Sequence, residues 1–231
     1  MKKYLAILVA ASAVLFSCSK MEGDVMPGDY DHYNQHGAQS EDISGVFNAI
    51  VTVKKTPTDS VYFQINDSET IYPANYQSKY TRMERIICCV NASSRPTGRF
   101  NYTCNVEWAE PIEEGLVTDS AVGRDPIDII DDWMTSVEDG YLTLHYNALW
   151  GNTPTIHSFS IVTGTSSDNP YVLVLRHDAK GDAQDWAGDG LVCFDINSLP
   201  DTEGQYKELT LKWNNLEGSA SERQFKFKTR E

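Results

Sequence analysis

The chain from residue 46 onward alternates between hydrophobic and polar residues in short runs separated by turn residues. A period of two predicts β-strands with one buried face and one polar face. Five such runs come first, and their apolar positions are Phe47, Ala49, Val51 and Val53; Val61, Phe63 and Ile65; Ile71 and Tyr72; Ile86, Cys88 and Val90; and Phe100, Tyr102, Cys104, Val106 and Trp108. Five strands of this length fit a small barrel or a rolled sheet, since closure removes exposed strand edges. We expect this domain to span residues 45–110.

A second series of β patterns follows a polar boundary. The boundary is acidic and holds Pro111, Gly115, Gly123 and Pro126, a composition typical of a connecting segment. The later runs predict strands at 133–137, 141–148, 156–163, 171–177, 191–196, 208–213 and 224–228. Seven strands at this spacing favour a sandwich, which we expect to span residues 118–231. Helical periodicity is nearly absent, with room for a turn or two at 198–206, so the predicted fold class is all-β.

The N-terminus carries a different pattern. Lys2 and Lys3 precede thirteen residues without a charge, a run too short to span a hydrocarbon core of roughly 30 Å and typical of a signal peptide. This run leads through Phe16 and Ser17 directly into Cys18, which resembles the lipobox of bacterial lipoproteins. The resemblance implies that residues 1–17 are removed and that Cys18 carries three acyl chains, which would anchor the protein to a membrane without spanning it.

Residues 18–44 are rich in Gly, Asp, His, Asn and Gln and show almost no aliphatic periodicity. Such a segment buries too little apolar surface to offset the entropy lost on ordering. We therefore predict a flexible tether between the anchor and the first domain. The implied location is the cell envelope, as an outer-membrane lipoprotein facing either the periplasm or the cell surface.

The composition changes the list of plausible partners. With 41% hydrophobic and 23% charged residues the chain is an ordinary globular protein. Its 19 basic and 33 acidic residues give a formal charge of -14, and removal of the two leader lysines makes it more negative still. Because this charge repels phosphate backbones, we expect no nucleic-acid partner.

Four further cysteines stand in the predicted domains, and disulfides persist in exported proteins. A hairpin register that pairs Cys88 with Cys104 would place both sulfurs on the apolar face of neighbouring strands. A slip of one residue would abolish this disulfide, so buried free thiols are the alternative. Cys193 alternates with Leu191 in a predicted strand and has the pattern of a small core residue.

An acidic loop is predicted at residues 177–190. It holds Asp178, Asp182, Asp185 and Asp189 with three glycines, and oxygen donors on a bending backbone suit Ca²⁺. The spacing differs from that of an EF-hand loop. A solvated acidic loop is the favoured interpretation in so negative a chain, and calcium binding is left open.

Catalysis has little support in the sequence. His145, His157 and His177 lie on separate predicted strands, and no HExxH, GxSxG or P-loop motif occurs. We therefore expect no enzyme, no cofactor and no metal. Two tryptophans, Trp150 and Trp186, fall in predicted loops, where aromatic side chains often contact a partner or a sugar ring. They are the predicted binding surface, either for a protein partner or for a glycan or small ligand.

Several motifs occur together in order along the chain. They are Thr70-Ile71-Tyr72-Pro73-Ala74, Gly123-Arg124-Asp125-Pro126-Ile127, Asp132-Trp133, Gly140-Tyr141-Leu142-Thr143-Leu144, and the run from Leu175 to Asp182. With the lipobox, they resemble the NigD-like lipoproteins of Bacteroides and Prevotella. The resemblance implies an N-terminal OB-type barrel, a C-terminal β-sandwich, an envelope location and a role like bacteriocin immunity. It supplies no catalytic residues, so the expected function is binding.

Overall fold

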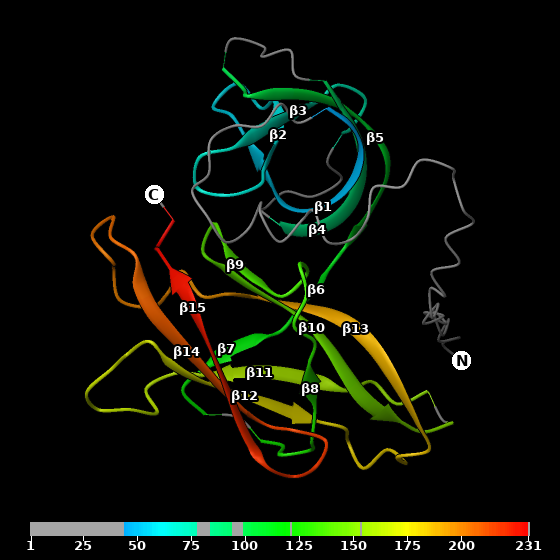
Figure 1. Cartoon of the computed structure of the whole chain (residues 1–231), viewed down its shortest axis with the longest axis vertical. Helices are drawn as coiled ribbons and strands as arrows, with labels where there is room; N and C mark the ends of the chain where they lie inside the picture. The colour runs from blue at the N-terminus through cyan, green and yellow to red at the C-terminus, as the bar shows by residue number, and fades with distance from the viewer. Residues whose placement is uncertain (1–43, 78–83, 94–98, 121, 153, 231) are drawn as a thin grey trace, which may run out of the picture.

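The computed structural model describes residues 44–77, 84–93, 99–120, 122–152 and 154–230. Figure 1 shows a small barrel stacked on one side of a larger sandwich. The predicted signal peptide, the lipid-anchor residue Cys18 and nearly all of the predicted tether lie outside the described residues. Within the described residues, no helix is long and apolar enough to cross a membrane.

The first five strands form a closed barrel. They are β1 (Gly45–Lys55), β2 (Val61–Gln64), β3 (Thr70–Pro73), β4 (Glu84–Ser93) and β5 (Tyr102–Pro111), and they close in the order β1-β2-β3-β5-β4. Only β3 and β5 pair in parallel. The alternation of the sequence is realised in the barrel, because Val51, Phe63 and Ile71 point inward and are fully buried. The prediction of an N-terminal barrel is confirmed.

The remaining strands form two sheets packed face to face. The first sheet has the order β6 (Glu113–Glu114), β13 (Trp186–Asp195), β10 (Tyr141–Trp150) and β8 (Asp128–Ile129), with β9 (Ser136–Glu138) also paired to β10. The second has the order β15 (Ala220–Phe227), β14 (Lys207–Asn214), β12 (Val172–Asp178), β11 (Ser158–Val162) and β7 (Leu116–Thr118). The predicted sandwich is therefore confirmed, and the segment at 198–206 contains turns and no helix.

The chain crosses from the edge of one sheet to the edge of the other between β6 and β7. Gly115 makes this crossing, and a Cβ there would lie 2.2 Å from the ring of Phe194. Phe194 is fully buried in the sandwich core. A side chain at position 115 would therefore displace part of that core.

A third apolar cluster joins the barrel to the sandwich. Its buried members are Ile50, Ile87, Ile112, Tyr141 and Cys193. Four of them lie on the outer face of β1 and β4 of the barrel and of β10 and β13 of the first sheet, and Ile112 lies between β5 and β6. This cluster fixes the two parts of the chain against each other by apolar burial.

A buried arginine crosses the same interface. Arg85 is 2% exposed, and its guanidinium donates hydrogen bonds to Thr52 Oγ1 at 3.0 Å and to Thr143 Oγ1 at 3.4 Å. Thr52 belongs to the barrel and Thr143 to the sandwich. Beside it, Lys54 Nζ lies 2.6 Å from Asp139 Oδ1, also across the interface. The interface therefore contains polar pairs within an apolar cluster.

Candidate functional site at the open edge of the sandwich

The two predicted binding tryptophans lie in strands, which corrects the expectation of loops. Trp150 ends β10, Trp186 begins β13, and the two are register partners. Their ring centroids lie 6.3 Å apart with planes 25° from parallel, and Trp186 is 48% exposed. The Trp186 indole donates to the Gly151 carbonyl at 3.1 Å, and the Trp150 indole donates to the Gly188 carbonyl at 3.3 Å. The structure therefore holds both rings in fixed orientations.

Two glycines of β13 make room for these aromatic rings. A Cβ at Gly188 would lie 2.5 Å from the Trp186 ring, and a Cβ at Gly190 would lie 2.7 Å from Tyr146 Oη. Real Cβ atoms do not approach other atoms this closely, so any larger residue would push the rings outward. The Gly-rich sequence that suggested a loop is thus required by aromatic packing on a strand.

The N-terminal half of β13 forms an open strand edge. On its outer side β13 pairs only with β6, at Val192 and Cys193, so residues 186–191 have no strand neighbour there in the described part of the chain. The Gly115 amide donates to the Cys193 carbonyl at 2.8 Å, so the backbone of Cys193 faces this edge. Because backbone direction alternates along a strand, the amide and carbonyl groups of Ala187, Asp189 and Leu191 face the same edge.

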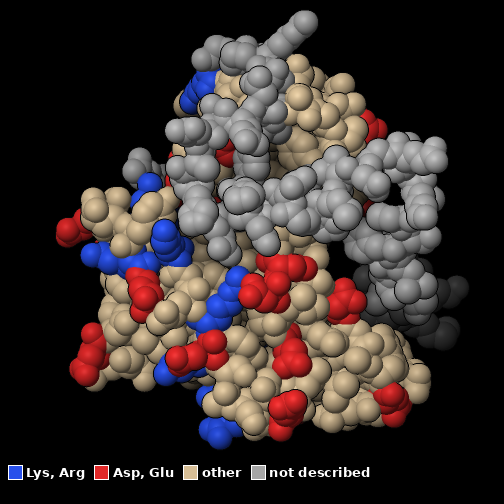
Figure 2. Space-filling view, in the orientation of Figure 1, with Lys and Arg blue, Asp and Glu red and all other residues tan. Residues whose placement is uncertain are grey.

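This edge lacks the charges that usually protect exposed strands. Its sequence, Trp-Ala-Gly-Asp-Gly-Leu, holds one charge, Asp189. The edge strand β15 of the second sheet carries Glu222, Arg223, Lys226 and a cation–π pair instead. Figure 2 shows Lys and Arg gathered over the side where β14 and β15 lie, whereas acidic and uncharged residues cover the side where β10 ends and β13 begins. Charged edges resist strand addition, so β13 is the more open of the two.

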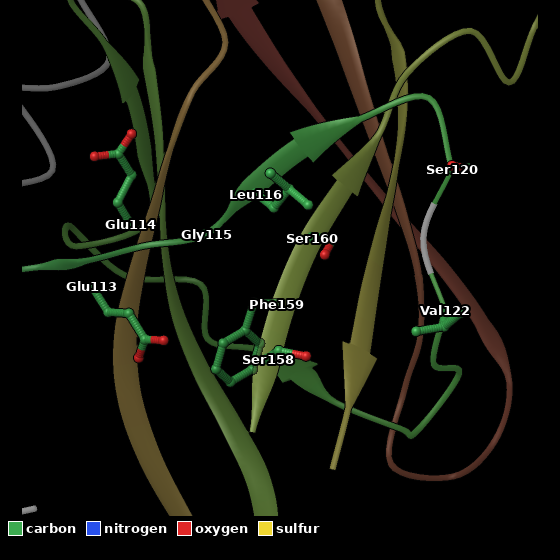
Figure 3. A pocket seen from close by; sticks show the side chains of 9 residues that line it. All are labelled: Glu113, Glu114, Gly115, Leu116, Ser120, Val122, Ser158, Phe159 and Ser160. Atoms are coloured by element: carbon green, nitrogen blue, oxygen red, sulfur yellow. The ribbon is translucent and has the colours of Figure 1, made fainter. Parts of the chain in front are cut away.

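A groove adjoins this edge where the chain crosses between the sheets (Figure 3). It is shallow and encloses about 550 Å³. Its lining residues are Glu113, Glu114, Gly115, Leu116, Ser120, Val122, Ser158, Phe159 and Ser160. Leu116 and Val122 are 61% and 77% exposed, and burial raises the pKa of the Glu113 carboxyl. The groove therefore combines exposed apolar side chains with carboxylates and hydroxyls.

Two of the three sandwich histidines meet beneath the tryptophans. His157 Nδ1 lies 2.9 Å from His177 Nε2, and both side chains are buried. The Trp150 ring stacks on His157 with centroids 3.9 Å apart and planes within 11°. The sequence placed these residues on separate strands and missed their contact. The pairing of Phe159 with His177 between β11 and β12 brings the two histidines together.

The third histidine lies on the outer face of the first sheet. His145 Nδ1 is 2.7 Å from Asp132 Oδ2, and its Nε2 is 3.2 Å from Asp189 Oδ2. The side chain of Asp189 is 70% exposed. His145 thus fixes a carboxylate beside the open edge of β13.

The acidic segment distributes its carboxylates among different partners. Asp178 pairs with Lys180, Asp185 accepts a hydrogen bond from Asn152, and Asp189 pairs with His145. Asp182 is buried against His157. No group of three candidate ligands converges on one point within the described ranges. The predicted loop at 177–190 is shorter than expected, because β12 ends at Asp178 and β13 begins at Trp186, and each of its four carboxylates has a partner of its own.

The predicted disulfide needs a correction. Cys88 and Cys104 are both buried free thiols. In the β4–β5 register Ala109 lies opposite Cys88 and Ala92 lies opposite Cys104, so the two cysteines are four positions apart along the ladder. Burial raises the pKa of Cys104 to about 12, so the thiolate needed for disulfide chemistry is scarce at neutral pH. Both side chains pack in the barrel core.

Comparison with solved structures identifies proteins of the same fold. A structure from Parabacteroides distasonis, provisionally described as toxin related, is 25% identical over 79% of this chain and 93% of its own, with a TM-score of 0.64. A NigD-like immunity protein from Bacteroides caccae is 20% identical over 79% and 94%, with a TM-score of 0.56. A structure from Bacteroides fragilis, provisionally described as a lipoprotein, is 14% identical over 80% and 100%, with a TM-score of 0.51.

No curated protein gives a significant match to the chain. The family model described as the NigD-like C-terminal beta sandwich domain matches residues 109–227. This match covers more than half of the chain and includes both sheets of the sandwich. The protein therefore belongs to the family defined by the NigD-like C-terminal beta sandwich domain.

Proposed function

We propose that the protein is a cell-envelope lipoprotein that binds a protein partner along the open edge of β13. The observation that carries this proposal is the row of backbone groups at Ala187, Asp189 and Leu191, which has no strand neighbour in the described residues. An extended segment of a partner can add to such an edge, where main-chain hydrogen bonds give affinity and adjoining pockets give specificity. The family is not a known enzyme family.

The surroundings of the edge favour a partner segment with basic and apolar side chains. Glu113 and Glu114 line the adjoining groove, and the exposed carboxylate of Asp189 belongs to β13 itself. Leu116 and Trp186 supply exposed apolar surface at the two ends of this region. Complementary charge speeds encounter and suppresses wrong partners, while the apolar side chains add burial.

The envelope location rests on the lipobox resemblance at Cys18 and on the lipoprotein description of the Bacteroides fragilis relative. Three acyl chains at Cys18 would hold the domains at a membrane surface, with residues 19–44 as a spacer. Labelled palmitate should enter the wild-type protein and should not enter Cys18→Ser. Equal labelling of the two, or an intact leader in the mass spectrum, would refute the anchor.

The partner class we favour is a bacteriocin, which the protein would intercept as an immunity factor. The Bacteroides caccae relative is named as a NigD-like immunity protein. Deletion of the gene should sensitise producing cells to their own toxin, and the wild-type gene should restore survival. Unchanged killing after deletion would remove this partner class.

A matched pair of variants tests the edge within the same assay. Ala187→Pro removes one outward amide, whereas Ala187→Ser keeps it, and Ala187 is an exposed strand residue. We expect the Ser variant to restore survival and the Pro variant to fail, although both fold with similar thermal midpoints. Full protection by the Pro variant would show that strand addition at this edge is not the mode of binding.

A second function is favoured by the exposed face of Trp186, which is 48% exposed and held by a hydrogen bond to Gly151. An indole face in this setting stacks on sugar rings. A glycan array should give hits with the wild-type protein that disappear with Trp186→Ala. An array without hits for the wild type would count against glycan binding.

A further inference from the structure

A buried chain of hydrogen bonds runs beneath the tryptophan pair. Asp182 Oδ2 lies 3.2 Å from His157 Nε2, His157 Nδ1 lies 2.9 Å from His177 Nε2, and His177 Nδ1 lies 3.2 Å from the Pro126 carbonyl oxygen. The side chains of His157 and Asp182 are 0% and 1% exposed. Asp182 also accepts hydrogen bonds from the Gly151 and Ala183 amides, which favours its charged form.

The two ends of this chain determine how many protons it needs. The Pro126 carbonyl can only accept a hydrogen bond, so His177 Nδ1 must carry a proton. The Asp182 carboxylate also accepts, so His157 Nε2 must carry a second proton. The contact between the two rings needs a third. Two neutral imidazoles carry only two protons, so neutral rings would leave one contact with two acceptors facing each other.

The surroundings indicate which ring holds the additional proton. Burial lowers the pKa of His177, and the nearby His157 lowers it further. His177 is therefore the neutral ring, with its proton on Nδ1 and its Nε2 lone pair directed at His157. His157 is then doubly protonated, between the Asp182 carboxylate and the face of Trp150. A cation stacked on an indole gains a further favourable interaction.

Of the other groups near the chain, the Pro126 carbonyl and Asp125 raise the pKa of His177, but burial outweighs them and the net direction is downward. Asp125 lies close to His177 and accepts a hydrogen bond from the Ala179 amide. Asp178 pairs with Lys180. On the remaining side, the ring of Phe159 stacks on His177 with planes within 7°. No charged partner other than Asp182 contacts His157 among the interactions of the described residues.

We propose that Asp182, His157 and His177 form a buried three-proton chain that acts as a pH-sensitive lock for the Trp150 end of the sandwich. Loss of the third proton leaves two acceptors facing each other. Gain of a fourth proton makes both rings cationic and removes the acceptor between them. Either change breaks a buried contact directly beneath Trp150. This inference is independent of any partner.

The effect on stability has a defined sign. In the unfolded chain each histidine titrates near its ordinary pKa of about 6.5, so the three groups hold about two protons above this pH and up to four below it. The native chain holds three. Above about pH 6.5 the native state binds more protons, so stability falls as the pH rises. Below it the unfolded state binds more, so stability falls as the pH drops. The contribution is largest near neutral pH.

Nitrogen-15 NMR of the histidine rings in the full chain tests the proton assignment directly. At neutral pH we expect protons on both nitrogens of His157 and on Nδ1 alone of His177. A singly protonated His157, or a proton on Nε2 of His177, would overturn the proposal. His145→Gln, which alters the other histidine network, should leave these signals unchanged.

A second measurement follows the lock itself. Tryptophan fluorescence and the thermal midpoint should both change on either side of neutral pH in the wild type. Asp182→Asn should remove the alkaline change in fluorescence, because an amide does not stabilise the cationic ring. His145→Gln should keep both changes. If the wild-type fluorescence and midpoint are flat across this pH range, or if Asp182→Asn responds as the wild type does, the lock does not exist.

Discussion

Replacement of Arg85 by Met should weaken the junction between the barrel and the sandwich. Arg85 lies directly opposite Thr52 in the β1–β4 register, and its guanidinium reaches Thr143 of β10. Both threonines are fully buried. The Met side chain fills part of the space of the Arg side chain but makes neither hydrogen bond. Arg85→Met therefore leaves the two threonine hydroxyl groups without their charged donor.

The expected loss of stability comes from three contributions. A buried hydroxyl without its partner costs about 1–3 kcal/mol, so two such groups cost roughly 2–6 kcal/mol. Removal of the buried guanidinium also removes the cost of its desolvation, which offsets part of this loss of stability. The adjacent Glu138, whose pKa burial raises to about 8, already holds its proton at pH 7, so removal of Arg85 leaves no unpaired charge there. We expect a net loss of about 2–3 kcal/mol in the free energy of unfolding at pH 7.

Urea unfolding followed by tryptophan fluorescence and by circular dichroism measures this loss. The triple variant Arg85→Met, Thr52→Val, Thr143→Val replaces every partner by an apolar group of similar shape and should recover most of the stability. Arg99→Met, at an exposed position, should stay within about 0.5 kcal/mol of the wild type. A loss below about 1 kcal/mol for Arg85→Met, or a triple variant less stable than the single one, would refute the reasoning.

Three further predictions follow from individual contacts. Gly188→Ala should displace the Trp186 ring, because the new Cβ would lie 2.5 Å from that ring. A shift of the tryptophan fluorescence maximum would report the displacement, whereas an unchanged spectrum would contradict this packing. Between pH 4.5 and about 8 the raised pKa of Glu138 makes the native state bind a proton that the unfolded chain has lost, so stability falls as the pH rises. Glu138→Gln should flatten the urea midpoint over this window, and an unaltered slope would exclude Glu138 as the cause. Added Ca²⁺ should leave the thermal midpoint and fluorescence unchanged, because the loop carboxylates bind separate partners; a raised midpoint would reveal a calcium site.

The strands of both domains were predictable because their cores have one buried face. The inward positions of β1, for example, follow the alternation of the sequence and are nearly all buried. A period of two identifies such strands without any knowledge of their neighbours. The order of strands and the crossing through Gly115 depend on long-range pairing, which a local pattern does not contain.

The candidate site was only partly predictable, for the same reason. Trp150 and Trp186 were identified as residues of interest, but the Gly- and Asp-rich sequence after Trp186 indicated a loop. Pairing with β10 over ten residues makes it a strand, since tertiary pairing overrides local β-propensity. The disulfide prediction was wrong because Cys104 lies opposite Ala92, four residues from Cys88 on β4, and local alternation does not fix the register of a hairpin. The contact between His157 and His177 depends on the pairing of β11 with β12.

Partner binding is proposed at the open edge of β13. Site-specific photo-crosslinking in intact cells tests it most directly, with a photoreactive residue in place of Ala187 on β13 or of Ala220 on β15, both exposed positions. We expect a discrete crosslinked protein from position 187 and none from position 220. No crosslink from position 187, or the same product from both positions, would contradict it.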